Sequence, residues 1–527
     1  MRVTIQRYRN HIFLLGLIAF LLHGAKINSV IIGIDTEDVI HSPSAFYEGW
    51  RNTGRQGLVF LKYISNTLQF NPFFSGVLTL LTLTLAVSSF FLLWERYSHI
   101  GDKNSLLAWV VGGLFWIAHP IMTEQLYFSV QSTEICFGIL MTALALWLID
   151  CNQNKSFRAK VIKRISAMII LILVFSVYQA LVPFYIFGAV AILFLKSTRT
   201  LSEGTNESAT GLLKPILPYL GVFLVSFLMN QGITKFFFDQ SSYLTDQIYW
   251  GKMPIRENLR LILHHVGAVH TGISVNIHYS PVYGLLCILT LLHMYLYVWR
   301  PVKGHTGQKW VVLLYLVALF CTPFLMTIVF GGSPTLRSQL VLPAITGFFA
   351  FLNILWVLDA WEKEHQRTRL LLNTLLCLIC ICGIWEESDI TLRFYYTEQM
   401  RYHQDAQLGY RLIETIDQVR EEDKLPILFI GHKSFQGNKA TITGEIIGKS
   451  FFDYDVDVEP TYYWSSRRII GFLHTLGSDY ELVDINLVED ILQRSNEMPV
   501  WPAEGSVQKF QDCIIIKLSD ANALMDI

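Results

Sequence analysis

Three carboxylates fall close together early in the chain, at Asp35, Glu37 and Asp38. Like charges held this close repel and raise one another's pKa, so the cluster is costly unless it has a use. It directly follows the first apolar run, residues 12–32, and ionisable groups at a membrane boundary are functional candidates by default. A carboxylate here suits general-base chemistry, the removal of a proton from a hydroxyl group. The structural alternative is a set of solvated charges that end a helix.

Other polar residues fall near the ends of later apolar runs, on the same predicted side of the membrane as the carboxylates. They are Trp50, Arg55, His119, Glu124, Tyr178, Gln179, Lys252 and Arg337. Cations would bind an anionic group, while a carboxylate activates an acceptor hydroxyl. A sugar carried on a lipid phosphate fits this combination, and such a donor needs no soluble nucleotide-sugar pocket.

Each of these residues also has a structural explanation. Glu124 is suited to cap a re-entering helix, and Tyr178 with Gln179 to satisfy backbone groups at a tight membrane turn. Arg337 has the length to reach lipid phosphates, and Lys252 suits a solvated loop. Which of the three carboxylates acts as the base stays open. They are also able to share a divalent ion, although no ligand spacing demands one.

The composition predicts a polytopic α-helical membrane protein. Of the 527 residues, 52% are hydrophobic and only 16% are charged, whereas soluble domains average about 25% charged residues. The apolar residues occur in blocks, and runs of about 18 or more are typical of transmembrane helices. The net charge of −1 provides no basic face, which argues against nucleic acid as a partner. Cysteines 377, 380 and 382 lie in an apolar run without histidine, which favours packing over metal binding.

The apolar runs predict about eleven transmembrane helices, an odd number that leaves the two termini on opposite sides. Arg7 and Arg9 place the N-terminus in the cytoplasm, so residues 33–72 form the first external loop. Within that loop, residues 47–70 predict an amphipathic helix at the interface. The run 166–195 is too long for one ordinary span, and its basic flanks predict two spans that meet outside.

From about residue 388 the composition becomes that of a soluble domain. The stretches LPILFIG (residues 425–431) and CIIIKL (residues 513–518) predict strands, and RRIIGFLHTLG (residues 467–477) predicts a helix. We therefore expect a transmembrane catalytic domain over residues 1–387 and a small extracytoplasmic α/β domain over residues 388–527.

The motifs of the first external loop resemble those of the GtrII-type glucosyl transferases, polytopic enzymes of the GT-C architecture. The likeness rests on E-D at residues 37–38, G-W at 49–50, G-R at 54–55, HPxxTE at 119–124 and SxYQ at 176–179. It covers roughly residues 1–388. The chain departs from the family's usual pattern in having Glu rather than Asp at the first position of the acidic pair, and Gln rather than Pro after the G-R.

The resemblance implies the function of the site. In GT-C enzymes an acidic residue of the first external loop is essential, often as base, and the donor is a polyprenyl-phosphate sugar. This role falls on Asp38 or Glu37, with Arg55 near the phosphate. The implied reaction transfers a hexose, glucose by the family's example, to a surface polysaccharide such as O-antigen, outside the inner membrane of a bacterium. The membrane lipids are the surrounding partners. The resemblance does not establish a cofactor, and a divalent metal ion stays an option.

The alternative function is a flippase or another transporter of lipid-linked sugars. A transporter would place ionisable groups near the bilayer midplane and serve both faces. This chain instead gathers them at the predicted external ends of its apolar runs, which favours an enzyme. A scaffold of a polysaccharide assembly complex, a third class, would not require clustered carboxylates.

Overall fold

The computed structural model describes residues 2–28, 30–98, 105–150, 156–205, 207–239, 241–274, 279–302, 304–361, 367–420 and 424–520. It divides into two compact units, which are described separately. Unit 1 comprises Met1–Asn28, Tyr47–Leu126 and Gln131–Leu392, and unit 2 comprises Ser29–Phe46, Tyr127–Val130 and Arg393–Ile527. The predicted boundary at residue 387 lies within one continuous helix, α20 (Arg367–Arg420), which contributes residues to both units.

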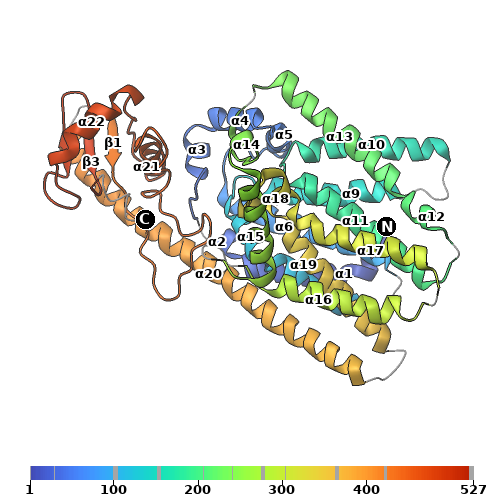
Figure 1. The fold of residues 1–527 in the computed structure, drawn as a ribbon. Coiled ribbons are helices and arrows are strands. Elements are labelled where there is room, and N and C mark those ends of the chain that lie inside the picture. Colours follow the sequence, from blue (N-terminus) through green and yellow to red (C-terminus); the bar gives the residue numbers. More distant parts are fainter. Residues whose placement is uncertain are drawn as a thin grey trace. The chain divides into compact units, whose positions relative to one another are not determined.

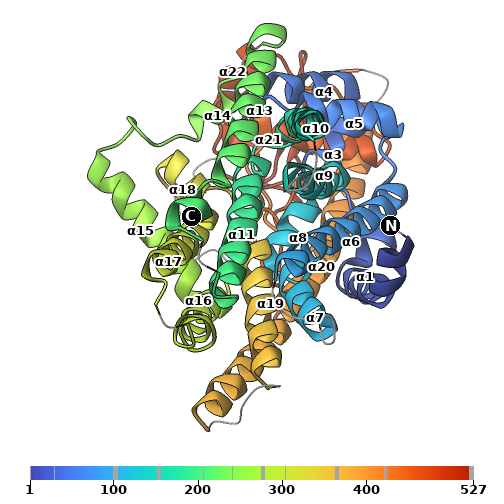
Figure 2. The same ribbon diagram turned by 90° about the vertical axis from the view of Figure 1, so that its right-hand side faces the viewer.

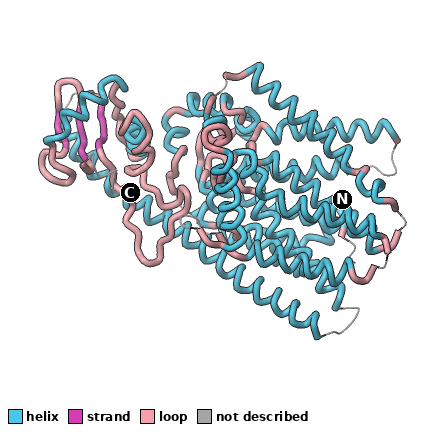
Figure 3. The backbone as a smooth tube through the Cα atoms, in the orientation of Figure 1, coloured by secondary structure: helices cyan, strands magenta, loops and turns pink. Residues whose placement is uncertain are grey.

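Unit 1 is built from helices, drawn in cyan in Figure 3. The longer ones are α1 (Arg2–His23), α6 (Pro72–Tyr97), α7 (Ser105–Ile117), α9 (Ser132–Asp150), α10 (Phe157–Phe175), α11 (Leu181–Ser202), α13 (Ile216–Phe237), α15 (Ile255–Thr271), α16 (Val282–His293), α17 (Thr306–Cys321) and α19 (Val341–Trp361). The shorter ones are α2 (Ala25–Asn28), α4 (Pro43–Asn52, which begins in unit 2), α5 (Gln56–Ser65), α8 (Pro120–Tyr127), α12 (Ala209–Leu213), α14 (Tyr243–Asp246), α18 (Leu325–Phe330), η1 (Met294–Trp299), η2 (Thr322–Phe324) and η3 (Leu336–Ser338).

The long helices of unit 1 pack as a bundle, with α6 against α9, α7 against α19, and α10 against α9 and α13 (Figures 1 and 2). Aromatic rings fill its centre. Trp94 stacks on Trp116 with ring centroids 5.7 Å apart and meets Phe348 edge-on at 4.8 Å. Helices α7 and α19 approach most closely at Gly112 and Gly347, where a Cβ on either residue would lie 2.6–2.7 Å from the other's carbonyl oxygen.

Helix length and composition make this a multi-pass helical membrane protein. Among the described residues, eight helices are long and apolar enough to cross a membrane, and a ninth arises if α7 and α8, bent by 53°, form one span. The run at 166–195 is divided, as predicted, because α10 ends at Phe175 and α11 begins at Leu181. The single amphipathic helix predicted for residues 47–70 is instead two, α4 and α5, since Gly54 turns the chain with a φ of +80°.

Unit 2 contains a three-stranded sheet in the order β1-β3-β2. Strands β1 (Ile427–Ile430) and β3 (Ile514–Lys517) are parallel and are the two stretches predicted as strands, while β2 (Val507–Lys509) is antiparallel to β3. Alternate side chains face opposite sides, so Ile427 and Phe429 join one apolar cluster and Leu428 joins another. Its other elements are α3 (Thr36–His41), α21 (Tyr463–Thr475), η4 (Ile485–Leu487), α22 (Val488–Arg494) and η5 (Ser495–Glu497).

The first part of the predicted external loop, residues 33–46, belongs to unit 2 because apolar residues anchor it there. Ile32 and Ile34 are buried in the cluster that includes Phe472 of α21. The backbone is also held, since Arg401 donates to the carbonyl of Ile32 at 2.9 Å and the amide of Ile34 donates to the hydroxyl of Tyr127 at 3.0 Å. These contacts fix the chain immediately before α3.

The contact between α7 and α19 generates a stability prediction. We expect Gly347→Val to lower the free energy of unfolding by about 1–3 kcal/mol, because its Cβ would collide with a helix backbone that has no room to move. Thermal unfolding of the detergent-solubilised protein, followed by tryptophan fluorescence, measures the effect. Gly221→Val in α13 is the matched control, since a Cβ at Gly221 meets no atom within 4 Å. Equal loss in the two variants would contradict the close packing.

Candidate active site

The acidic segment forms one cluster at the start of α3. Asp35 adopts the left-handed conformation, with a φ of 73°, and ends the preceding extended chain so that the helix begins at Thr36. Aspartate tolerates this conformation better than most residues. Glu37 and Asp38 then lie in the first helical turn. The three carboxylates therefore converge on one side of α3, as the sequence predicts they would if they acted together.

The partner of all three carboxylates is Arg468 of α21, a helix that packs against α3. Its Nη1 donates to Glu37 Oε1 at 2.7 Å, and to Asp35 Oδ1 and Asp38 Oδ2 at 3.3 Å each. A fourth carboxylate, Asp455, accepts from Arg468 Nε at 3.1 Å. Charge-assisted bonds of this kind are stronger than neutral ones, so the guanidinium fixes the arrangement of the cluster.

The neighbouring Arg467 adds a weaker link. Its Nη2 lies 3.3 Å from Asp38 Oδ1, and its side chain is half exposed. Four carboxylates are thus met by two guanidinium groups, and the cluster keeps an excess of negative charge. Arg468 itself is held by more than ion pairs, because its guanidinium lies over the ring of Tyr454, 5.7 Å from the centroid.

The three carboxylates differ in their access to solvent. The side chain of Glu37 is only 1% exposed, that of Asp38 19% and that of Asp35 30%. One oxygen of Glu37, Oε2, is buried without a hydrogen-bond partner. Glu37 packs tightly against Gly471 of α21, where a Cβ would lie 3.0 Å from Glu37 Cγ. Glu37 is therefore an internal group of the cluster, and Asp38 and Asp35 are its accessible ones.

Burial sets the protonation of Glu37. It raises the pKa of this carboxyl to about 8, from an ordinary value of 4.5, and the attraction of Arg468 offsets the rise only in part. The negative charges of Asp35 and Asp38 raise it further. At neutral pH Glu37 thus carries a proton for much of the time, which removes it as a strong base.

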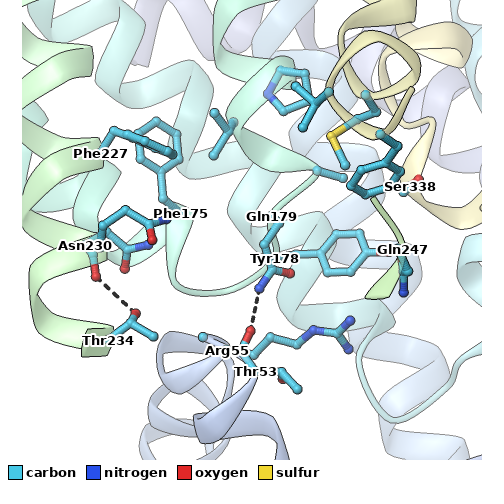
Figure 4. Close-up of a pocket in the computed structure, with 18 of the residues that line it drawn as sticks. Thr53, Arg55, Phe175, Tyr178, Gln179, Phe227, Asn230, Thr234, Gln247 and Ser338 are labelled. Atoms are coloured by element: carbon cyan, nitrogen blue, oxygen red, sulfur yellow. Dashed lines mark hydrogen bonds between the residues drawn. The ribbon is translucent and has the colours of Figure 1, made fainter. Parts of the chain in front are cut away.

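A cavity of about 780 Å³ lies in unit 1 and holds four of the other predicted residues, Arg55, Tyr178, Gln179 and Arg337. Pockets of this size accommodate small organic ligands. It is lined from the α4–α5 turn, the α10–α11 break, α13, and the segment from α18 to η3 (Figure 4). Its charged lining residues are all cations, with Lys235 joining the two arginines, and no carboxylate lines it in the described part of the chain.

The polar wall of the cavity is built by side chains that tie the α4–α5 turn to its neighbours. Gln179 donates to the carbonyl of Thr53 at 2.7 Å (Figure 4). The Arg55 guanidinium lies over the ring of Tyr178, 5.1 Å from its centroid, and donates to Gln131 at 3.4 Å. The turn is pressed against the α10–α11 break, where the amide of Gly57 donates to the carbonyl of Ser176 at 2.9 Å.

Another part of the cavity wall is apolar. Phe175 of α10 and Phe227 of α13 line the cavity (Figure 4), as do Phe223 of α13 and Met326 and Val329 of α18. The lining of the cavity thus combines cations with hydrocarbon and aromatic surface. This arrangement suits an amphiphilic anion, whose charged group needs the cations and whose apolar part needs the wall.

The four remaining predicted residues do not line this cavity. Trp50 is buried in α4, and its carbonyl accepts from the amide of Arg55 at 2.8 Å. Trp50 therefore stabilises the α4–α5 turn through its backbone. His119 and Glu124 are buried beside the α7–α8 bend. Lys252 is exposed in a loop and donates to the carbonyl of Asp246 at 2.6 Å.

The sequence analysis missed the basic partners of the acidic cluster. Arg467 and Arg468 were part of a segment recognised only as helical, and Asp455 was not singled out. The available signal was the adjacent pair of arginines before the apolar stretch IIGFL of the predicted helix. Charge complementarity with the acidic segment would have connected the two, but more than 400 residues separate Asp38 from Arg468. In the described residues, no group of three or more His, Cys, Asp or Glu side chains has the arrangement of a metal site.

The raised pKa of Glu37 generates a pH prediction. The folded state holds a proton on Glu37 that the unfolded chain releases above about pH 4.5, so the free energy of unfolding should fall as the pH rises towards 8. The slope from this group is at most about 1.4 kcal/mol per pH unit. We expect Glu37→Gln to flatten the pH dependence between pH 5 and 8.

Thiol labelling of Cys513 measures the opening of unit 2, because this thiol is fully buried beside β3. The measurement uses a background in which the seven other cysteines are replaced. Rates are normalised at each pH to those of the denatured chain, which removes the intrinsic pH dependence of the thiol. The same slope in Glu37→Gln and in the parent would show that Glu37 does not hold the extra proton.

Comparison with known proteins assigns the chain to a family. The family model described as glucosyl transferase GtrII matches residues 25–354, which is 330 of the 527 residues and includes the acidic segment and every residue that lines the cavity. Neither the curated proteins nor the solved structures contain a match. Because the matched region spans well over half of the sequence, this membrane protein belongs to the GtrII glucosyl transferase family.

Proposed function

We propose that this membrane glycosyltransferase moves glucose from a polyprenyl-phosphate carrier to a cell-surface polysaccharide outside the cytoplasmic membrane of a bacterium. The observation that carries the proposal is the cavity of unit 1, with its cations, its apolar wall and, among the described residues, no lining carboxylate. A polyprenyl-phosphoryl sugar has the matching chemistry: a phosphate diester next to a long hydrocarbon chain. A nucleotide sugar would leave the apolar wall without a partner.

The cations of the cavity have a defined part in the reaction. Arg55 and Arg337 bind the phosphate of the donor and stabilise the negative charge that develops as the bond from the sugar to the phosphate breaks. Arginine is well suited to this task because its planar guanidinium presents several donors to phosphate oxygens. Tyr178 stacks on Arg55 and Gln179 holds the turn that carries it, so both act by keeping Arg55 in place.

The acidic cluster supplies the base. Asp38 accepts the proton of the acceptor hydroxyl as that oxygen bonds to the anomeric carbon of glucose, and polyprenyl phosphate leaves with the electron pair of the broken bond. Asp38 is preferred to Glu37 because its side chain is accessible and Glu37 is buried with a raised pKa. Asp35 is the second accessible carboxylate and helps to orient the acceptor.

The proposed topology places this chemistry outside the cell. Eleven crossings result when α1 and α10 are added to the eight candidate spans and the bent pair α7–α8. With the N-terminus in the cytoplasm, both the acidic segment and residues 388–527 are then extracytoplasmic, as in the GT-C architecture. The donor reaches the site within the bilayer, and the polysaccharide reaches it from the aqueous side.

Removal of the base tests the proposal directly. We expect Asp38→Asn to lower the rate of glucose transfer by about 10²–10⁴-fold, because the amide cannot accept the hydroxyl proton. The assay follows release of polyprenyl phosphate from polyprenyl-phosphoryl glucose by the purified protein, with surface polysaccharide from a strain lacking this enzyme as acceptor. Glu504→Gln, an exposed position of unit 2, is the control. A wild-type rate in Asp38→Asn would contradict the assignment of Asp38 as the base. No release of polyprenyl phosphate by the wild-type protein would contradict the assignment of polyprenyl-phosphoryl glucose as the donor.

The cavity cations generate a separate prediction about binding. We expect Arg55→Gln and Arg337→Gln each to raise the KM for the donor about tenfold or more, since each removes a charge-assisted contact to phosphate. Steady-state kinetics at varied donor concentration provide the measurement. Arg260→Gln in α15, whose side chain is 79% exposed, is the matched control and should keep the parental KM. An unchanged donor KM in both cavity variants would place the phosphate elsewhere.

A further inference from the structure

The carboxylates of the acidic segment depend on residues far along the chain. Asp455, Arg467 and Arg468 all lie beyond residue 354, where the family match ends. Yet Arg468 contacts Asp35, Glu37 and Asp38 at once. The match therefore contains the acidic residues without the cation that holds them.

We propose that Arg468 is a positioning residue for glucosyl transfer, and that the C-terminal unit is thereby a working part of the active site. Its guanidinium holds the three carboxylates in one arrangement and keeps Asp38 turned towards the acceptor. This inference rests on the proposed function, and in particular on Asp38 as the base. It assigns to residues 393–527 a role in the chemical step in addition to any contact with the polysaccharide.

The geometry of the guanidinium supports this role. Nη1 serves the three carboxylates of the acidic segment, while Nε is directed to Asp455 at 3.1 Å. Asp455 and the ring of Tyr454 thus fix the plane of the guanidinium from the far side. A guanidinium fixed in this way presents its donors to the acidic segment in a constant direction, which a freely rotating ammonium group would not do.

The charge balance gives the guanidinium a second effect. A nearby positive charge favours the ionised form of a carboxylate, and nearby negative charges disfavour it. Without Arg468, the side chains of Asp35, Glu37 and Asp455 would each lose an ion pair, and Asp38 would keep its contact with the half-exposed Arg467. The repulsion among the four carboxylates would then be less well compensated, and their arrangement would change.

The position of the backbone does not depend on Arg468. Arg401, which is fully buried between Glu398 and Asp405, holds the carbonyl of Ile32, and the Tyr127 hydroxyl holds the amide of Ile34. These contacts and the apolar cluster hold α3 against the rest of unit 2. Arg468 thus acts on the carboxylates rather than on the fold, and its removal is expected to change the kinetics before it changes the stability.

The test compares Arg468→Gln and Arg468→Lys with a matched control in the full-length protein. Arg420→Gln is the control, because Arg420 is also a mostly buried arginine of unit 2 that lies over a tyrosine ring and pairs with an aspartate, Asp479. The readouts are kcat, donor KM, the pH profile of kcat, and thiol labelling of Cys513 as a measure of folding. His41 and His474, whose rings meet at 4.0 Å between α3 and α21, are present in every variant and so contribute equally to the profiles.

We expect Arg468→Gln to lower kcat about 10²-fold with little change in donor KM, because it disturbs the base and not the phosphate contacts. The pH profile of kcat in this variant should differ from the parental profile. Arg468→Lys should restore the parental profile, since the charge returns, but only part of kcat, since one ammonium cannot reproduce the forked contacts. Arg420→Gln should keep the parental kcat and profile.

Carboxyl labelling gives a readout that does not require activity. With a carbodiimide and an amine, Asp35 and Asp38 should label faster in Arg468→Gln than in the parent or in Arg420→Gln, as measured by mass spectrometry. Parental kcat and pH profile in a folded Arg468→Gln protein would overturn the inference. So would an increased kcat, which would make Arg468 an inhibitory cap. An active Asp38→Asn protein would instead overturn the proposed base, and the labelling result would still report whether Arg468 holds the carboxylates.

Discussion

The arrangement of the acidic side chains in unit 2 depends on a single electrostatic constraint, the meeting of four carboxylates with the guanidinium of Arg468. Such a cluster is unfavourable unless its charges are paired, and Glu37 at its centre is almost completely removed from water. Several local features follow from this constraint. The chain turns through a left-handed residue at Asp35, and α21 brings its arginines to the first turn of α3. The acidic segment is therefore not a solvated helix end.

Unit 1 carries the complementary kind of charge. Its cavity is lined by Arg55, Lys235 and Arg337 beside aromatic and aliphatic side chains, and its lining includes no acidic residue in the described part of the chain. The cavity cations belong to unit 1 and the acidic segment belongs to unit 2. In the proposed reaction the cations act on an anion and the carboxylates on a proton.

The sequence predicted those features that depend on local patterns. The membrane class, the break between α10 and α11 and the strands β1 and β3 followed from apolar run length, flanking charge and composition. The turn at Gly54 was not predicted, because the apolar spacing continues through it and only contact with the α10–α11 break reveals its purpose. Arg468 was missed for a related reason. Pairing between residues more than 400 positions apart leaves no periodic signal in one sequence. The count of eleven crossings and the choice of site residues remain predictions.

Gly471 occupies the interior of α21, where glycine weakens a helix by about 1 kcal/mol relative to alanine. Glycine is nevertheless suited to this position, because Glu37 fills the space that a side chain would need. An alanine at this place would require Glu37 to move by a few tenths of an ångström, and a bulkier residue would displace the Glu37 side chain while leaving every charged group present. A homologue with a bulky residue here would retain all the recognisable motifs of the family and yet arrange its acidic side chains differently. Surveys that score only the ionisable positions would fail to detect that difference.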